Sequence, residues 1–292
     1  MTDPQGGPAG GGSPSGRVRE NSSTEAGPGS VVLGRSGLLF PRLGIGTGTS
    51  GFECQSRQSK QRPADLSRIL LAAHELGVSW WDSSDDYGTH PHLATALGAV
   101  ERESVRVSTK THARTADQAR RSIALALEEL RVSYIDLFFL HDLDAPGEFE
   151  GRSGALESLQ EAKARGLVRA IGISTHNIDT LEASVGRPEI DVVMTNFNRF
   201  EDHMDAGLRD YTRALEAHHA AGTGVAVMKA VGEGRLAHVA AESIGWNLER
   251  PFIHCVLVGM ESLAEVHANA RLAAGIRRSR ATGDRPPEAD QG

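Results

Sequence analysis

Cysteine and long apolar segments are scarce in this sequence. Its 292 residues include only 2 cysteines, Cys54 and Cys255, too few for a disulfide framework and not clustered as a structural zinc site requires. No apolar segment approaches the roughly 20 residues that cross a bilayer, and the N-terminus lacks the basic and apolar pattern of a signal peptide. We therefore expect a cytoplasmic protein with reduced thiols.

Basic and aromatic residues are also few. The chain has 31 Lys and Arg against 38 Asp and Glu, a formal net charge of −7, which gives no general attraction to nucleic acid or an anionic membrane. Aromatic residues make up 5% and form no platform for stacking bases. Hydrophobic residues make up 39% and charged residues 24% of the sequence, as is typical of globular proteins. This composition excludes a disordered, fibrous or transmembrane protein. We expect a small-molecule partner, no nucleic acid and no membrane, and assign no oligomeric state.

Both ends of the chain are poor in residues that could pack in a core. Residues 1–30 contain 8 Gly, 4 Pro and 5 Ser, and residues 276–292 are charged and interrupted by Pro286 and Pro287. We expect both segments to be disordered tails. The 245 residues between them, 31–275, match the ~250 residues of one (β/α)₈ barrel domain.

Short β-branched and apolar segments alternate with helical ones in this central part, the pattern of parallel strands joined by crossover helices. Eight predicted strands suggest closure into a (β/α)₈ TIM barrel. The competing architecture, an open doubly wound sheet, needs a Gly-rich turn after its first strand, whereas Gly44 and Gly46 lie within that strand. The predicted strands span residues 42–47, 78–83, 105–110, 134–141, 168–174, 191–196, 224–229 and 252–259, and the clearest helices span 64–76, 116–130, 154–165 and 207–220.

Two further features concern the helices. Thr115 with Gln118, and Ser262 with Glu265, have the spacing of capping boxes that open a helix. Residues 235–251, between the seventh and eighth strands, leave room for little more than one short helix. This interval is the weakest match to a regular barrel.

Polar residues stand at the ends of several predicted strands, where a barrel carries its chemistry. Asp82 closes the second strand, with Tyr87 five residues later; Lys110 closes the third, His141 the fourth and Ser174 the fifth. Each alone has an ordinary explanation, such as a loop cap, a solvated charge or a hydrogen-bonded core histidine. Together they are hard to explain as structure, because each buried polar group needs a partner. Strand alternation aims Lys110 into the barrel.

Four separated motifs carry a specific resemblance. Residues 82–88 read DSSDDYG, 108–110 read STK, 136–141 read DLFFLH, and 172–177 read GISTHN. In order and spacing they resemble the aldo-keto reductase family, over about residues 34–273. The resemblance implies a (β/α)₈ barrel enzyme, an oxidoreductase that uses NAD(P)H to reduce an aldehyde or ketone to an alcohol.

The resemblance also implies four catalytic residues. Tyr87 would give its proton to the developing alkoxide, and an adjacent Lys110 ammonium would lower the pKa of this phenol. Asp82 would pair with Lys110 and fix it in place. His141 would hydrogen-bond the substrate oxygen and orient it.

The same comparison implies cofactor contacts near the nicotinamide. Ser174 matches the serine that holds the nicotinamide amide, and Thr47 lies at the position near its ribose. Met228 and Lys229 occupy the seventh-strand platform, where relatives commonly stack an aromatic ring on the nicotinamide. Met228 could equally fill a gap in the core.

Contacts to the adenosine end would come from residues 259–269, including Gly259, Ser262 and Asn269. Many relatives that prefer NADPH place Lys, Ser and Arg around the 2′-phosphate, where this chain has Gly259, Met260 and Glu265. Glu265 would repel a phosphate or would only cap its helix. NADPH is the expected cofactor from the resemblance, and NADH is the alternative.

Two further positions depart from the family pattern. Gly48 stands where some relatives place a tryptophan over the substrate, so a wider or loop-filled pocket is expected. Thr175 and His176 stand where relatives often have Asn and Phe.

Three other functions fit parts of the sequence. His90-Pro91-His92, with Lys110 and His141, could serve a metal-dependent barrel hydrolase, although the pair lies beyond the second strand, and we assign no metal ligand. Lys110 could form a Schiff base in a lyase. A nucleotide-binding regulatory subunit of the same fold with slow turnover is the third.

Overall fold

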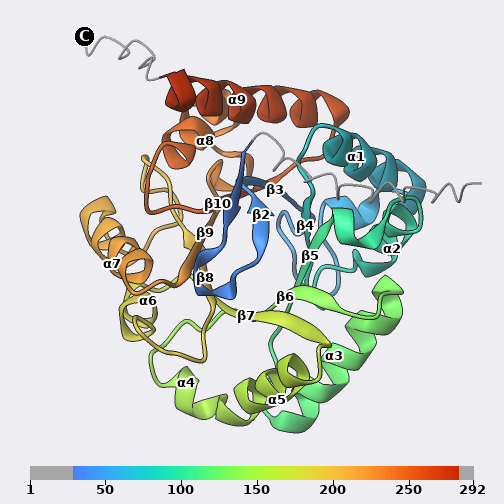
Figure 1. Cartoon of the computed structure of the whole chain (residues 1–292), viewed down its shortest axis with the longest axis vertical. Helices are drawn as coiled ribbons and strands as arrows, with labels where there is room; N and C mark the ends of the chain where they lie inside the picture. Colours follow the sequence, from blue (N-terminus) through green and yellow to red (C-terminus); the bar gives the residue numbers. More distant parts are fainter. Residues whose placement is uncertain (1–28, 283–292) are drawn as a thin grey trace, which may run out of the picture.

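Eight parallel strands close into a barrel in the computed structural model, which describes residues 29–282 (Figure 1). The strand order is β10-β3-β4-β5-β6-β7-β8-β9, and β10 pairs with β3 through Val256 and Leu43, which closes the sheet. The predicted (β/α)₈ TIM barrel is thus confirmed, and the open doubly wound sheet is excluded. The strands are β3 Leu43–Gly46, β4 Trp80–Asp82, β5 Arg106–Thr111, β6 Ile135–Leu140, β7 Val168–Thr175, β8 Val192–Asn196, β9 Gly224–Met228 and β10 Cys255–Gly259.

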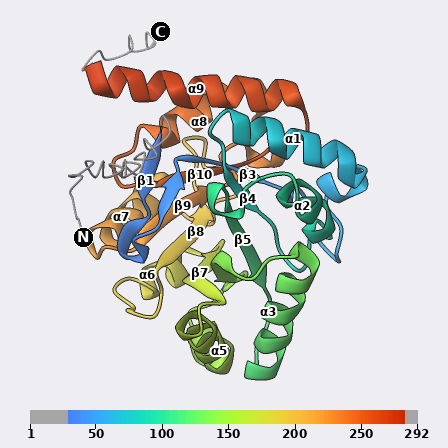
Figure 2. The same ribbon diagram turned by 45° about the vertical axis from the view of Figure 1, so that its right-hand side comes forward.

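Helices surround the barrel and cover its outer face, and α9 lies beside α8 and α1 in both views (Figure 1 and Figure 2). They are α1 Pro63–Glu75, α2 His90–Leu97, α3 Ala116–Leu130, α4 Glu148–Gly151, α5 Ser153–Ala164, α6 Ile178–Ala183, α7 Leu208–Ala220, α8 Ala240–Leu248 and α9 Leu263–Thr282, with 3₁₀ turns at Gly34–Ser36, Gln58–Lys60, Arg102–Ser104, Gly232–Gly234 and Ala237–Val239. The predicted interval between the seventh and eighth strands, residues 235–251, holds the turn Ala237–Val239 and the short α8. Within the described part of the chain, every helix is too short or too polar to cross a bilayer.

Helix α3 shows how local sequence forms these elements. Its predicted capping box is present, because the Thr115 side chain accepts from the Gln118 N–H while the Gln118 side chain reaches back to the Thr115 N–H. Ala119, Ile123, Ala126 and Leu130 form the buried face of the helix at helical spacing. These residues join the outer core cluster, between barrel and helices.

An antiparallel hairpin, β1 Ser30–Val32 and β2 Leu39–Pro41, covers the amino-terminal end of the barrel. Leu33 and Phe40 of the hairpin join the inner core cluster with Trp80, and the Phe40 and Trp80 rings meet edge to face at 5.6 Å. Gly44 makes room for this packing, since a Cβ there would lie 2.3 Å from the Trp80 ring. We call the end sealed by Leu33, Phe40 and Trp80 the closed end, and the opposite end, where the strands finish, the open end.

Alternation along β5 follows the predicted pattern. Val107 packs in the outer cluster, whereas Ser108 accepts a hydrogen bond from Trp80 Nε1 inside the barrel at 2.8 Å. Lys110, two residues later, shares this inward direction and is buried. The barrel interior therefore leads from an apolar closed end to a polar open end.

The predicted limits of the folded part, 31–275, need correction. Strand β1 begins at Ser30, and α9 continues to Thr282, seven residues past the expected limit. Charge alone does not end a helix, and the first proline after residue 275 is Pro286. Ile276 packs on the outer cluster beside Gly245. The rest of the two predicted tails, 1–28 and 283–292, lies outside the described residues.

Candidate active site

A buried ion pair lies at the open end, between β4 and β5. Lys110 Nζ donates to Asp82 Oδ2 at 2.5 Å and to the Ser83 carbonyl at 2.8 Å, and Ser108 Oγ donates to Asp82 Oδ1 at 2.6 Å. The strand register pairs Asp82 with Ser108, which places Lys110 one inward position further along. Burial raises the pKa of Asp82, and the Lys110 ammonium and the Ser108 hydroxyl oppose this shift.

Tyr87 lies over this ion pair. The loop after β4 turns back through a hydrogen bond from the Tyr87 N–H to the Ser84 carbonyl at 3.3 Å. Lys110 Nζ is 4.8 Å from the Tyr87 ring centroid, and the phenol oxygen is 3.4 Å from His141 Nε2. Asp82, Lys110, Tyr87 and His141, predicted from four separate motifs, are therefore brought together.

The predicted lowering of the Tyr87 pKa is wrong. The pKa of this phenol is raised well above its usual value, mainly by burial and to a smaller extent by the nearby Asp82 and Asp142 carboxylates. The Lys110 ammonium, held by Asp82 Oδ2 and the Ser83 carbonyl, does not reverse this shift. The phenol is therefore fully protonated near neutral pH, which is the form that can donate a proton.

Two glycines hold the Tyr87 ring. A Cβ on Gly48 would lie 2.1 Å from Tyr87 Cε2, and a Cβ on Gly51 would lie 2.4 Å from Cδ1. The loop that follows β3 therefore approaches the ring along both of its edges. A side chain at either glycine would therefore displace the Tyr87 ring.

His141, the residue after β6, completes the group. Its Nδ1 lies 3.3 Å from Ser84 Oγ, and its ring packs edge to face on Tyr87. Burial, together with the neighbouring Lys110 and His112 charges, holds the pKa of His141 well below its usual value. The imidazole is therefore neutral. With the Ser84 hydroxyl donating to Nδ1, the tautomer that carries its proton on Nε2 can hydrogen-bond an oxygen in the pocket.

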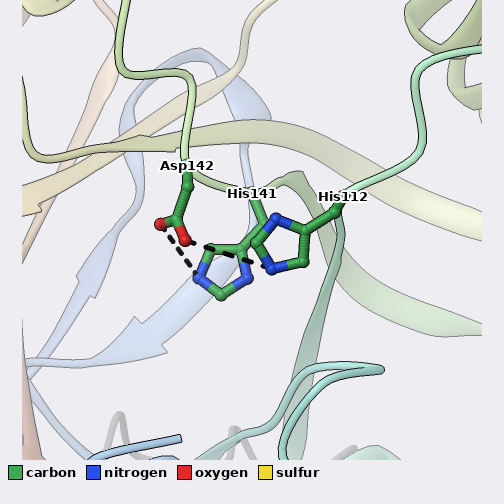
Figure 3. Close-up of side chains that lie close together, drawn as sticks. All are labelled: His112, His141 and Asp142. Atoms are coloured by element: carbon green, nitrogen blue, oxygen red, sulfur yellow. Dashed lines mark ion pairs between the residues drawn. The ribbon is translucent and has the colours of Figure 1, made fainter. Parts of the chain in front are cut away.

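Further residues extend this site, and two of them, His112 and Asp142, are not predicted from the sequence. The His112 ring stacks on His141 at 4.5 Å, and Asp142 Oδ1 lies 3.2 Å from His141 Nε2 (Figure 3). His176 Nδ1 approaches the same Asp142 oxygen at 3.4 Å. Each of these residues directly follows a strand or a strand-end functional residue, and that position is the signal that could have identified them.

Positions predicted near a nicotinamide surround the same end of the barrel. The Ser174 hydroxyl accepts from the Asp142 N–H at 3.2 Å, and the Thr47 hydroxyl donates to the Asp82 carbonyl at 2.8 Å. Met228 is half-buried against the inner cluster, and Lys229, which follows it with a positive φ of 54°, pairs with Glu233 at 3.1 Å. Thr47 thus also supports the Asp82 backbone.

Asn196 is a further candidate that sequence reasoning missed. It ends β8, in register with Met228 on β9, and its Oδ1 is buried without a hydrogen-bond partner among the described residues. An unpaired buried acceptor calls for a donor. The amide NH₂ of a nicotinamide is such a donor, so the residues present fit this cofactor.

The residues predicted to contact the adenosine differ in how far they are exposed. Gly259 is exposed, and a Cβ there would lie 2.3 Å from Thr49 Oγ1. Met260 is buried in the outer cluster and faces no ligand. Ser262 lies just before α9, and Asn269 is half-buried on that helix.

Glu265 has a capping role at the start of α9. Its N–H donates to Ser262 Oγ at 3.3 Å, as expected for a capping box. Its carboxylate, however, accepts from the Glu261 N–H at 2.6 Å, one residue before the expected partner. Two carboxylates, Glu261 and Glu265, therefore lie together at the start of α9.

The His90-Pro91-His92 pair does not converge on a metal. His90 Nδ1 meets Glu129 at 2.7 Å and Nε2 meets Thr109 at 2.8 Å, while His92 Nε2 meets the Gln61 carbonyl at 2.9 Å. Both nitrogens of His90 are thus engaged on the outer face of the barrel. The structure gives this pair a packing role in α2.

Comparisons with known proteins agree with the fold and identify the family. The Aldo/keto reductase family matches residues 42–242. Aldo-keto reductase family 1 member C21 of Mus musculus is 28% identical over 181 residues, covering 54% of each chain, and the NADH-specific methylglyoxal reductase of Escherichia coli strain K12 is 23% identical over 198 residues, covering 60% of each. The chain therefore spans somewhat more than half of the length of these relatives.

A solved structure shows the same architecture. The holo form of an aldo-keto reductase from Bacillus halodurans matches with a TM-score of 0.69 at 18% identity, covering 90% of this chain and 98% of that chain. Since this identity is low, the likeness supports the fold alone. The family match, in contrast, spans more than half of the chain. The chain belongs to the aldo/keto reductase family.

Proposed function

We propose that this protein reduces an aldehyde or ketone to an alcohol, with a reduced nicotinamide cofactor as hydride source and Tyr87 as proton donor. The observation that carries the proposal is the convergence of Asp82, Lys110, Tyr87 and His141 at the open end of the barrel. The bound cofactor supplies the hydride that reaches the carbonyl carbon. The carbonyl oxygen, as it gains negative charge, takes the proton of the Tyr87 hydroxyl.

Each of the four residues has a separate task. His141 donates from Nε2 to the carbonyl oxygen and orients it beside the phenol. The Lys110 ammonium, 4.8 Å from the ring centroid, stabilises the phenolate that forms when the proton leaves. Asp82 holds this ammonium in place at 2.5 Å. The tyrosinate then recovers a proton from water.

The cofactor would lie across the open end. Ser174 and Asn196 would hold the nicotinamide amide, Thr47 would lie near its ribose, and Met228 with Lys229 would support the ring. Gly259, Ser262 and Asn269 would line the path of the adenosine. The Lys110 amine already donates to Asp82 and Ser83 and is buried, which disfavours a Schiff-base mechanism.

We propose further that NADH is accepted in preference to NADPH. Met260 is buried, and Glu261 and Glu265 put carboxylates at the adenosine end, where a carboxylate can bind a ribose hydroxyl but repels a 2′-phosphate. Arg57, the cation nearby, pairs with Glu261 at 3.0 Å. Substitution of Glu265 by Gln or Arg should shift the ratio of kcat/KM values towards NADPH, and an unchanged ratio would leave the capping role as the only one.

The test combines cofactor titration with an aldehyde panel that includes methylglyoxal, followed through nicotinamide absorbance. The Tyr87→Phe variant should lose about 10²-fold or more in kcat while it binds cofactor normally. Tyr134→Phe is the matched control, because Tyr134 lies before β6, at the other end of that strand, and packs on Arg102 and Arg169. Unchanged turnover in Tyr87→Phe would refute the donor, and cofactor binding without turnover of any aldehyde would favour a regulatory nucleotide-binding protein.

A further inference from the structure

Three side chains at the open end bring metal-binding atoms together. His112 follows β5, His141 follows β6, and Asp142 is the next residue, so two neighbouring strands carry all three (Figure 3). One donor atom of each lies within 4.8 Å of the others, and no other such group occurs among residues 29–282. His112 and Asp142 have no role in the proposed reduction.

The separations suit a transition-metal ion. His141 Nε2 and Asp142 Oδ1 are 3.2 Å apart, close to the about 3.3 Å between two ligands bound tetrahedrally to zinc at its usual bond lengths. His112 Nε2 is 4.0 Å from Asp142 Oδ2. A shared ion would require the His112 side chain to move inward, and its 43% exposure leaves it free to do so.

Asp142 gives an independent indication of a missing partner. Its Oδ1 is a buried acceptor that forms no hydrogen bond within the described chain. Its backbone is in the left-handed region, with φ of 50°, where a residue other than glycine is uncommon. Asp142 Oδ1 thus lies near two imidazole nitrogens, 3.2 Å from His141 Nε2 and 3.4 Å from His176 Nδ1, without the geometry of a hydrogen bond to either.

The surroundings also favour a cation. Ser84 Oγ lies at Nδ1 of His141, on the far side of the ring from Nε2, as second-shell partners of metal-bound histidines do. Asp86 is 3.8 Å from His112 Nε2, and Asp144 approaches His176 at 3.6 Å, so further carboxylates surround the mouth of the site. The exposed His112 provides the route from solvent.

We propose that His112, His141 and Asp142 form a binding site for a divalent transition-metal ion such as Zn²⁺, and that the bound ion inhibits the enzyme. The inhibition follows because His141 Nε2 cannot hold both the metal and the carbonyl oxygen. This second half rests on the proposed reductase function, whereas metal binding does not. The ion is therefore a reversible blocker of the pocket and takes no part in the reaction.

Direct binding is tested first, without any assay of activity. Co²⁺ is added to the purified full-length protein and the visible absorption of the cobalt is recorded, and Zn²⁺ is titrated by calorimetry. One ion should bind at micromolar concentration, with the intense visible bands of a low-symmetry nitrogen and oxygen site. His112→Ala and Asp142→Asn should each weaken this binding by about tenfold or more; asparagine is chosen because it tolerates the left-handed backbone.

Two controls locate the ion. His267→Ala removes an exposed histidine on α9 and should change nothing. Cys54→Ser tests the exposed thiol as a competing ligand, because the Cys54 backbone N–H donates at 3.2 Å to Asp86, which lies 3.8 Å from His112 Nε2. Loss of the cobalt bands in Cys54→Ser, or their persistence at full strength in His112→Ala, would overturn the assignment.

Inhibition is tested second, as the ratio of rates with and without Zn²⁺. Micromolar Zn²⁺ should abolish carbonyl reduction by the wild type, EDTA should restore it, and the concentration for half inhibition should rise about tenfold or more in His112→Ala. Metal binding that leaves the rate unchanged or raises it would refute the inhibitory role. An enzyme without any reductase activity would refute the proposed function and leave the binding result standing.

Discussion

The two ends of the barrel are built from the same eight strands and differ in almost every other respect. At the closed end, Leu33, Phe40 and Trp80 pack without charge. At the open end, Asp82, Lys110 and His141 are equally buried yet ionisable. Packing contacts mainly stabilise the side chains at the closed end, whereas those at the open end depend on specific hydrogen bonds. Substitutions at the closed end should therefore change the free energy of unfolding, and those at the open end should change the chemistry.

The largest effect is expected at the ion pair. Lys110→Met should lower kcat by about 10³-fold, because the phenolate loses its stabilising charge. It should also lower the free energy of unfolding by about 3–5 kcal/mol, since the Asp82 carboxylate stays buried without its partner. Adding Asp82→Asn should restore much of the stability and none of the activity. Denaturation curves and initial rates check both, and a double variant that regains activity would contradict the assigned roles.

Trp80→Ala is the matching change at the closed end. Loss of this fully buried ring should cost about 3–5 kcal/mol in the free energy of unfolding, through the cavity and the lost contact with Phe40. The effect on kcat at a temperature where the variant is folded should be much smaller than that of Lys110→Met. A kcat as low as in the lysine variant would show that the two ends are not separable.

A pH effect is expected at the closed end as well. His254, just before β10, accepts from the Val225 N–H at 3.0 Å through Nδ1, and burial lowers the pKa of His254 to about 4. The unfolded chain binds a proton below the ordinary pKa of 6.5 and the folded chain does not, so this contribution to stability is lost as the pH falls from 6.5 to about 4.

The variant His254→Asn isolates this contribution. Its stability should change less with pH than that of the wild type, by at most about 3 kcal/mol over this interval. Denaturant titrations at several pH values measure it, with the exposed His267→Asn as control. Parallel curves for the wild type and His254→Asn would disprove the linkage.

A smaller effect concerns position rather than charge. Gly48→Ala introduces a Cβ that must move the Tyr87 ring, and kcat/KM should fall about tenfold because the proton donor is displaced from the carbonyl oxygen. Gly98→Ala, where the nearest atom would be 3.6 Å from the new Cβ, is the control. Equal activity of the two variants would mean that the loop adapts without moving the phenol.

The smallest effect tests whether every polar residue near the open end serves chemistry. Thr115 caps α3, and Thr115→Ala should lower the free energy of unfolding by about 1 kcal/mol with no change in kcat. Thermal denaturation with parallel assays measures both quantities. A fall in kcat would place this helix start within the site.

Much of this architecture could be predicted, because it depends on local patterns. Strand alternation placed Ser108 and Lys110 inside the barrel, and the Thr115 capping box was found with its correct partner. The end of the folded part is predicted too early at residue 275, because charged residues alone do not end a helix and α9 continues to Thr282.

The site was predicted by residue type but not by environment. The raised pKa of Tyr87 depends on burial and on carboxylates from three separate segments, which no single motif contains. His112 and Asp142 lie close in sequence to the predicted residues Lys110 and His141. Only the pairing of β5 with β6 in the folded barrel brings the His112 ring near the His141 ring and the Asp142 carboxylate. Asn196 became visible as a candidate only through its unpaired oxygen.

One hydrogen-bonded chain crosses the boundary between the two ends. Trp80 Nε1 donates to Ser108 Oγ, which donates to Asp82, which in turn holds Lys110. An indole N–H in such a chain is a built-in optical probe, because its ultraviolet absorption and fluorescence respond to the polarisation of its acceptor. The Trp80 ring is fully buried, so solvent does not contact it. Its near-ultraviolet spectrum should therefore respond to changes of charge at the open end.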